Sequence, residues 1–335
     1  MNENELMEAV RQARLEVEAR RKGSDREALA RSLESAASLN MKTADVVPAS
    51  EALEEAGRLW SGLNRFDNAG NCYLLAASSF RLASMMDRAA RSLDSGQALR
   101  ENLDEKLRRG FVMERSEQHL ASGRFSQAVQ GFAEIIGEEE VRSNPLLLAQ
   151  VMQRRAAASI AGGSPESGAD DLLECSRIYE THRKPGDAEA CGLAASAALC
   201  AVDPEAAEKI YLRFESGVPE NGAAACRRGM VGGKTALSLG KPELALKRFD
   251  QARQGALDTA DPVLFFSAAV AASEAAESAG EITTAYGRLA SAWVTLSDLI
   301  GKDSAGLWVR PVLANLKLRL GDEVFNSARR AYEKR

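Results

Sequence analysis

The chain has 335 residues, with 43 Lys and Arg against 48 Asp and Glu and a formal net charge of −5. Basic and acidic residues are interspersed, which argues against nucleic-acid binding, because that requires a concentrated basic surface. No apolar run approaches the roughly 18 residues of a membrane span, so we expect no membrane insertion. Hydrophobic residues make up 45% of the chain, and alternating strand-type patterns are absent, which together predict a helical core.

The first 45 residues read as two helices. Residues 5–21 carry an apolar stripe at helical spacing and end in basic residues, where positive charge suits the helix dipole. Ser24 and Glu27 have the spacing of a capping box, which predicts a second helix from there to about Asn40. We expect residues 1–45 to form an N-terminal helical cap or a degenerate repeat. The N-terminus is charged throughout and is not expected to be a signal peptide.

A break at residues 41–49 separates this segment from the repeating part of the chain. The helix after the break contains Trp60, and Asn64 stands at the turn that follows it. Residues 84–107 read as one long helix with alternating charge toward its end. We therefore expect residues 46–335 to form one solenoid body.

Residues 109–137 contain the clearest helical hairpin. Gly123 separates two segments of helical period, because Gly takes the left-handed C-terminal conformation without a steric penalty. Phe125, Ala128 and Phe132 follow at fixed offsets. Ala128 is small enough to let the two helices approach, and Phe132 fills the groove beside the next hairpin.

The same pattern recurs through most of the sequence. The segments after Gly240 and Gly280 place an Ala and then a large apolar residue at the same offsets. Degenerate copies bring the turn markers to residues 123, 163, 203, 240, 280 and 321, which are 40, 40, 37, 40 and 41 residues apart. Most prolines fall at the expected turns or first helical turns, where proline is tolerated.

This pattern of two helices, a turn residue, a small residue and a large apolar residue resembles the tetratricopeptide (TPR) repeat. The spacing exceeds the roughly 34 residues of the standard unit and is similar to the longer units of kinesin light chains, SNAP-type adaptors and bacterial regulators. The resemblance implies an all-α fold, a right-handed TPR-like α-solenoid of stacked antiparallel helix pairs over residues 50–332. From the helical periodicity and its turns we expect about fourteen to sixteen helices and almost no sheet.

The cysteines indicate a compartment. The chain has five, an odd number, and no pair has CxxC spacing. Most lie on Ala-rich helices, where Cys acts as a small apolar residue. We interpret them as reduced thiols, which favours a cytoplasmic location; they are Cys72, Cys175, Cys191, Cys200 and Cys226.

One segment has the appearance of a nucleotide site. Residues 229–235 read Gly-Met-Val-Gly-Gly-Lys-Thr, which is similar to a phosphate-binding loop. That motif needs Gly at the position of Arg228 and a preceding strand, and neither is present. Gly233 has a better role as the small contact residue of the repeat that ends at Gly240. We therefore expect no nucleotide or other cofactor.

No set of residues predicts catalysis. The two histidines, His119 and His182, have no partner at triad spacing, and no metalloprotease, nucleophile-elbow or EF-hand motif is present. The acidic run Glu138–Glu140 reads as a solvated connector, because three adjacent carboxylates do not converge on one ion. We expect a non-enzyme without a metal site.

The solenoid surface is then the candidate site. In a TPR superhelix the first helix of each hairpin lines the inner groove, and its exposed positions meet the ligand. The resemblance implies a partner-binding set of Arg58, Met113, Glu117, Gln153, Met230, Lys234, Glu274 and Glu277. These residues are mixed in charge and do not form the basic clamp with which some TPR domains hold a C-terminal carboxylate.

We interpret the chain as a non-catalytic adaptor or scaffold that binds another protein, because shallow solenoid grooves take helices or extended peptides. Docking on a filament surface or a coiled-coil assembly is a narrower version of this hypothesis. The alternatives are a regulatory TPR protein that senses a peptide and a SNAP-like trafficking or disassembly adaptor.

Overall fold

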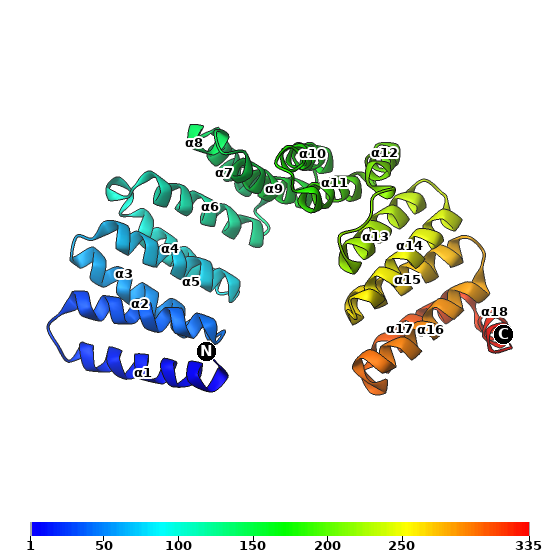
Figure 1. The fold of residues 1–335 in the computed structure, drawn as a ribbon, viewed down its shortest axis with the longest axis horizontal. Coiled ribbons are helices and arrows are strands. Elements are labelled where there is room, and N and C mark those ends of the chain that lie inside the picture. Colours follow the sequence, from blue (N-terminus) through cyan, green and yellow to red (C-terminus); the bar gives the residue numbers. More distant parts are fainter. Residues whose placement is uncertain (1, 335) are drawn as a thin grey trace. The chain divides into compact units, whose positions relative to one another are not determined.

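Figure 1 shows the fold in a computed structural model that describes residues 2–334. Within that range every regular element is a helix, which confirms the all-α solenoid, and the eighteen α-helices exceed the expected number. The chain divides into two compact units, unit 1 (Met1–Gly162) and unit 2 (Gly163–Arg335).

The bounds of the elements are as follows. Unit 1 contains α1 (Glu3–Arg21), α2 (Arg26–Lys42), α3 (Val46–Gly62), α4 (Phe66–Leu82), α5 (Met86–Gln97), a 3-10 helix η1 (Arg100–Asn102), α6 (Glu105–Ala121), α7 (Phe125–Gly137), the short α8 (Glu139–Arg142) and α9 (Pro145–Ala161). Unit 2 contains α10 (Pro165–Thr181), α11 (Pro185–Leu199), α12 (Pro204–Glu215), α13 (Gly222–Ser238), α14 (Pro242–Asp258), α15 (Pro262–Ser278), α16 (Ile282–Ile300), α17 (Lys302–Leu320) and α18 (Asp322–Glu333).

Eight of the described helices end in the same left-handed turn. At Gly123 the backbone has φ of 73°, its N–H donates to the Leu120 carbonyl at 3.1 Å, and the next N–H, of Arg124, donates to the His119 carbonyl at 2.8 Å. These two bonds define a Schellman motif, which satisfies carbonyls at the end of the helix. The same pair of bonds recurs at turns that carry no glycine; the non-glycine residues at positive φ are Ala44, Asn64, Ser84, Arg183 and Ala260.

Where these turns follow one another without interruption they are 20 residues apart, two for each 40-residue unit, as at Ala44, Asn64 and Ser84 and again at Gly240, Ala260 and Gly280. A small residue follows most of these turns by five positions, where the new helix packs closely against its predecessor. In seven helices it is a buried Ala; these are Ala49, Ala69, Ala89, Ala128, Ala188, Ala245 and Ala285.

Within each unit the helices alternate between two layers. Successive helices pack as antiparallel neighbours, and arginine–carboxylate pairs join helices that are next but one in sequence. In unit 1 these pairs link α1 to α3 (Arg21–Glu55), α3 to α5 (Arg88–Glu54), α4 to α6 (Arg81–Glu114) and α6 to α9 (Arg154–Glu117). One layer of unit 1 thus contains α1, α3 and α5, and the other contains α4, α6 and α9.

Unit 2 repeats this arrangement. Pairs join α10 to α12 (Arg213–Glu180), α11 to α13 (Arg228–Glu189), α12 to α14 (Arg248–Glu208), α14 to α16 (Arg288–Asp250) and α15 to α17 (Arg319–Glu277). Every cation in these bridges is Arg, whose planar fork suits a carboxylate better than the point charge of Lys.

Two local predictions were wrong. Residues 84–107 are not one helix: α5 ends at Gln97, and Leu103 is extended with φ −88° and ψ 147°. Leu103 is buried in the unit 1 core, and the following Asp104 caps α6 by accepting from the Leu107 N–H at 2.7 Å. Asp203, one of the expected turn markers, lies in the turn between α11 and α12, where it is the N-cap of α12. The side chain that caps α2 is Asp25, not Ser24.

Candidate functional site

Three of the eight predicted residues line one groove in unit 1. Met113 and Glu117 are on α6, and Gln153 is on the neighbouring α9 of the same layer. The groove has a volume of about 850 Å³ and extends to the C-terminal end of α4. We call it the α4–α6–α9 groove; its lining is Arg81, Leu82, Met113, Glu114, Glu117, Gln150, Gln153, Arg154 and Ala157.

The charges of this groove are arranged in pairs. Arg81 Nε donates to Glu114 Oε1 at 2.6 Å and Arg81 Nη2 donates to Glu114 Oε2 at 3.1 Å. The Glu114 side chain is 9% exposed, and its hydrogen bond raises the pKa of the Arg81 guanidinium. Arg154 Nε lies 3.3 Å from Glu117 Oε1 at the opposite wall. The walls therefore present both signs of charge with no net excess.

Between the paired charges the groove offers apolar and amide surface. Leu82 is 68% exposed, Met113 is half-buried, and the methyl group of Ala157 is exposed. Gln150 is exposed on α9, one turn before Gln153. Apolar contacts beside an amide that can both donate and accept suit a polypeptide, whose backbone has both functions.

Arg58 lies apart from this groove. It is on α3, in the layer of α1 and α5, and lines a separate cavity of about 580 Å³ with residues of α1, α2 and α5. The hairpin assignment placed α3 in the same row as α6, whereas Glu54 of α3 pairs with Arg88 of α5. The turns at Asn64 and Gly123 are three helices apart, and this odd number places α3 and α6 in opposite layers.

The remaining predicted residues are in unit 2, on adjacent helices of one layer. Lys234 on α13 and Glu274 on α15 are exposed, whereas Met230 is half-buried against two core clusters. Glu277 accepts two hydrogen bonds from Arg319 of α17, at 3.0 and 2.7 Å. Glu277 therefore belongs to one of the ion pairs that join alternate helices, and it is also a surface residue.

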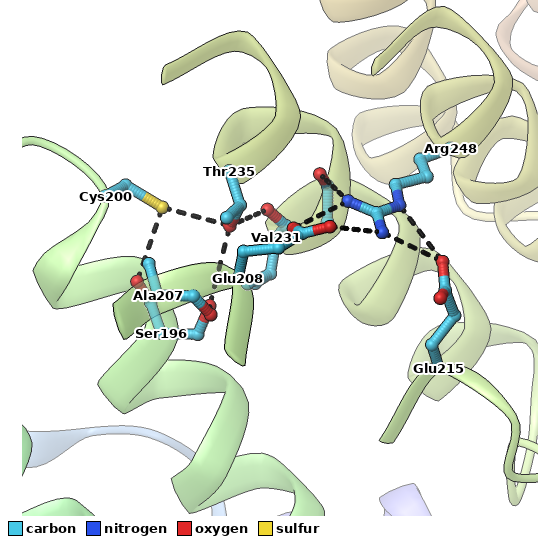
Figure 2. A network of polar contacts seen from close by, with 9 residues as sticks. Ser196, Cys200, Ala207, Glu208, Glu215, Val231, Thr235 and Arg248 are labelled. Carbon is cyan, nitrogen blue, oxygen red and sulfur yellow. Dashed lines mark hydrogen bonds and ion pairs between the residues drawn. The ribbon is translucent and has the colours of Figure 1, made fainter. Parts of the chain in front are cut away.

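The glycine-rich segment 229–235 lies inside α13 and forms no loop. A Cβ on Gly233 would come within 2.4 Å of the Phe249 ring, so this glycine permits close packing. Thr235 is buried, donates to the Val231 carbonyl at 2.9 Å and lies 3.2 Å from Cys200 Sγ (Figure 2). Its hydroxyl is used in packing, while Lys234 points to solvent, so the pair is not arranged as in a phosphate-binding loop.

Neither histidine belongs to a catalytic arrangement. His119 is half-buried on α6, and burial, with repulsion from Arg124 and Arg115, lowers its pKa. His182 is exposed at the end of α10, and its Nδ1 lies 2.8 Å from the Ile178 carbonyl. Among the described residues no group of three His, Cys, Asp or Glu is placed to hold a metal ion.

The acidic connector differs from the solvated loop that we expected. Glu138 and Glu140 both pair with Arg109, whose side chain is only 9% exposed, at 3.3 and 2.6 Å. Burial raises the pKa of Glu138, and Arg109 opposes that shift. Two of the three carboxylates thus neutralise a buried arginine of α6.

All five cysteines are buried, and none is in a disulfide with another described residue. Burial raises the pKa of Cys72, as does the hydrogen bond to Glu34 at 3.1 Å, and burial also raises the pKa of Cys226. Raised thiol pKa values disfavour the thiolate, which is the nucleophilic form.

Sequence reasoning missed the residues that frame the α4–α6–α9 groove. Arg81, Glu114 and Arg154 pair over 33 and 37 positions of sequence, so their partnership depends on which helices share a layer. Arginines and acids spaced by roughly one repeat were the available signal.

No family model matches this chain, and no curated protein does. Its structure is similar to the apo form of the quorum sensor NprR from B. thuringiensis, with 10% identity, 85% of this chain and 84% of that chain covered and a TM-score of 0.55. BtubC (BKLC) from P. vanneervenii aligns with 16% identity over 88% of this chain and 92% of its own, with a TM-score of 0.30. In residues 2–334 no helix is both long and apolar enough to cross a bilayer. The first likeness and the recurring helix pairs identify the fold as a TPR-like helical repeat.

Proposed function

We propose that this protein is a non-catalytic binding protein that holds a polypeptide segment of a partner in the α4–α6–α9 groove. The observation that carries the proposal is that Met113, Glu117 and Gln153 all line the α4–α6–α9 groove, whose charged side chains are already paired with one another. Paired wall charges give a groove without net charge, which is suited to a mixed polar and apolar chain and not to a phosphate backbone.

The proposal includes a cytoplasmic location, because free buried thiols persist in a reducing compartment. An adaptor that docks on a filament or coiled coil, or a SNAP-like adaptor, would use the same groove for a helical segment. A peptide-sensing regulator is the second candidate, and the fold-level likeness to the quorum sensor NprR favours it.

Selection from a displayed peptide library on the immobilised full-length chain tests this proposal. Selected peptides are titrated by fluorescence polarisation against the wild type, Ala157→Trp and Ala19→Trp. Ala157 lies in the groove, whereas Ala19 is an equally exposed helical alanine on α1 that lies outside it. We expect Ala157→Trp to weaken peptide binding at least about tenfold, because the indole ring fills the groove. The affinity of Ala19→Trp should equal that of the wild type. Equal affinities for the three proteins would show that the peptide binds outside the groove. If no peptide is enriched, the proposal that this protein binds a polypeptide segment is wrong.

A further inference from the structure

The regular stacking of unit 1 is interrupted at α5. This helix has 12 residues, whereas α2, α3, α4, α6 and α9 each have 17. Five missing residues correspond to roughly 7.5 Å of helix at 1.5 Å per residue. The chain fills part of that length with η1 and then turns inward at Leu103. The layer of α1, α3 and α5 is therefore open beside the C-terminal end of α5.

The bridging pairs are also interrupted at this place. Arginine pairs join α1 to α3 and α3 to α5, but among residues 2–334 no ion pair joins α5 to α7. The side of α7 that faces the opening carries Gln127, Gln130 and Glu134, which are one helical turn apart. Unpaired polar side chains of α7 thus occupy the place at which an arginine–carboxylate pair joins the other helices of this layer.

A cavity of about 330 Å³ occupies this opening. We call it the α5–α7 notch; it is lined by Gln97, Arg100, Phe111, Val112, Arg115, Ser116, His119, Gln127, Gln130, Gly131 and Glu134. Its volume corresponds to about eleven water molecules at roughly 30 Å³ each. The notch is at the lower end of the range for small-molecule sites and is too small for a folded domain or a nucleotide chain.

The notch contains charged and polar groups without internal partners. Arg115 is held by Asp94 at 2.5 Å and Gln97 at 3.3 Å, but Arg100 and Glu134 make no ion pair with any described residue. Both are exposed, so each can turn toward a ligand. His119 lines the notch with part of its ring, while its Nδ1 is buried behind the surface without a hydrogen-bond partner among the described residues.

We propose that the α5–α7 notch binds a small zwitterion, a dipeptide or similarly short peptide with free termini. Arg100 receives the carboxylate and Glu134 receives the ammonium group, while the amides of Gln127 and Gln130 bind the peptide group between them. The His119 ring lies in the wall of the notch, so a bound ligand changes its surroundings. The notch is on the layer of α5 and α7, whereas the α4–α6–α9 groove is on the other layer, so each site can fail without the other.

The two histidines make this proposal testable in the intact protein. His119 and His182 are the only histidines of the chain, so two Cε1–H signals appear in a carbon–proton NMR spectrum, and His182→Gln assigns them. The probes are the alanyl dipeptides that carry each natural side chain, added to about 10 mM, a range that detects millimolar affinity. The same dipeptides with acetylated and amidated ends serve as uncharged counterparts.

We expect at least one zwitterionic dipeptide to shift the His119 resonance saturably, with the His182 resonance unchanged and the blocked counterpart at least about tenfold weaker. Arg100→Gln and Glu134→Gln should each weaken binding about tenfold. Arg91→Gln and Glu101→Gln alter exposed residues outside the notch and should leave it unchanged. The proposal is wrong if no dipeptide shifts His119 saturably, or if blocked and free dipeptides bind alike and the two notch variants retain full affinity.

Discussion

Replacing Ala260 with Gly should stabilise the protein, although it removes a methyl group. Ala260 has φ of 51°, and its side chain is exposed, so no packing is lost. An L-residue in the left-handed region costs about 1–2 kcal/mol, whereas Gly carries an entropic penalty of roughly 0.5–1 kcal/mol. The difference predicts a net gain of about 0.5–1 kcal/mol in the free energy of unfolding. Ala44, with φ of 58°, is the equivalent position in unit 1.

The assay is a thermal melt of four proteins that differ only in unit 2. A gain of about 0.5–1 kcal/mol corresponds to a rise of roughly 1–4 °C in the melting temperature of a unit of this size. Gly280→Ala makes the reverse change in the same kind of turn, at φ of 77°, and should lower the midpoint. Ala194→Gly, at an exposed position inside α11, should lower it by about 1 kcal/mol, the helix-propensity difference. If Ala260→Gly lowers the midpoint as Ala194→Gly does, the left-handed turn assignment is refuted.

Three further changes test the core, the bridging pairs and the buried histidine. Ala128→Trp places a large ring at a fully buried position and should destabilise unit 1 by about 1–3 kcal/mol or more in urea unfolding; an unchanged unfolding midpoint would contradict the repeat alignment. Arg248→Met leaves two glutamates without their shared arginine, whose side chain is 3% exposed, and should cost about 3–5 kcal/mol in the same assay. The matched Arg319→Met breaks a pair whose arginine is 50% exposed and should cost no more than about 1 kcal/mol, so equal losses would argue against burial as the cause. The pKa of His119 is lowered in the folded protein, so the unfolded state binds more protons and stability should fall as pH drops through about 6.5. Thermal melts from pH 8 to 5 should show that His119→Gln weakens this pH dependence. The control His182→Gln, at an exposed position, should keep it.

The glycine-marked turns could be predicted because glycine is the residue type that favours the left-handed region. Gly123, Gly240 and Gly280 all have positive φ, and the offsets counted from them placed buried residues correctly. Arg183 and Ala260 adopt the same conformation without any residue-type preference for it. At those turns the Schellman hydrogen bonds and the packing of the flanking helices impose the conformation. The glycine markers therefore show the repeat of about 40 residues, whereas the turn in the middle of each unit carries no such marker.

The candidate groove was predicted only in part, for a related reason. The layer of a helix depends on how many helices precede it, so treating the turns at Asn64 and Gly123 as equivalent placed α3 and α6 in one layer although they are three helices apart. The break between α5 and α6 is made by Leu103, an apolar residue that packs into the core against Gly70, and not by a Gly or Pro. Local pattern does not reveal such a break, because the cause is tertiary packing. Met113 and Gln153 lie after the break and were placed together, whereas Arg58 lies before it.

The arginine pairs explain how a core rich in alanine can specify one register. Small side chains permit close approach but discriminate weakly between sliding positions of one helix along the next. A bidentate contact such as Arg248 with Glu208, at 2.9 Å for both nitrogens, is satisfied over only a narrow range of positions. Bridges between alternate helices therefore fix the stacking where the alanine contacts do not. The opening between α5 and α7 has neither the bridge nor the full helix length, so there the regular stack gives way to a polar cavity that a ligand can fill.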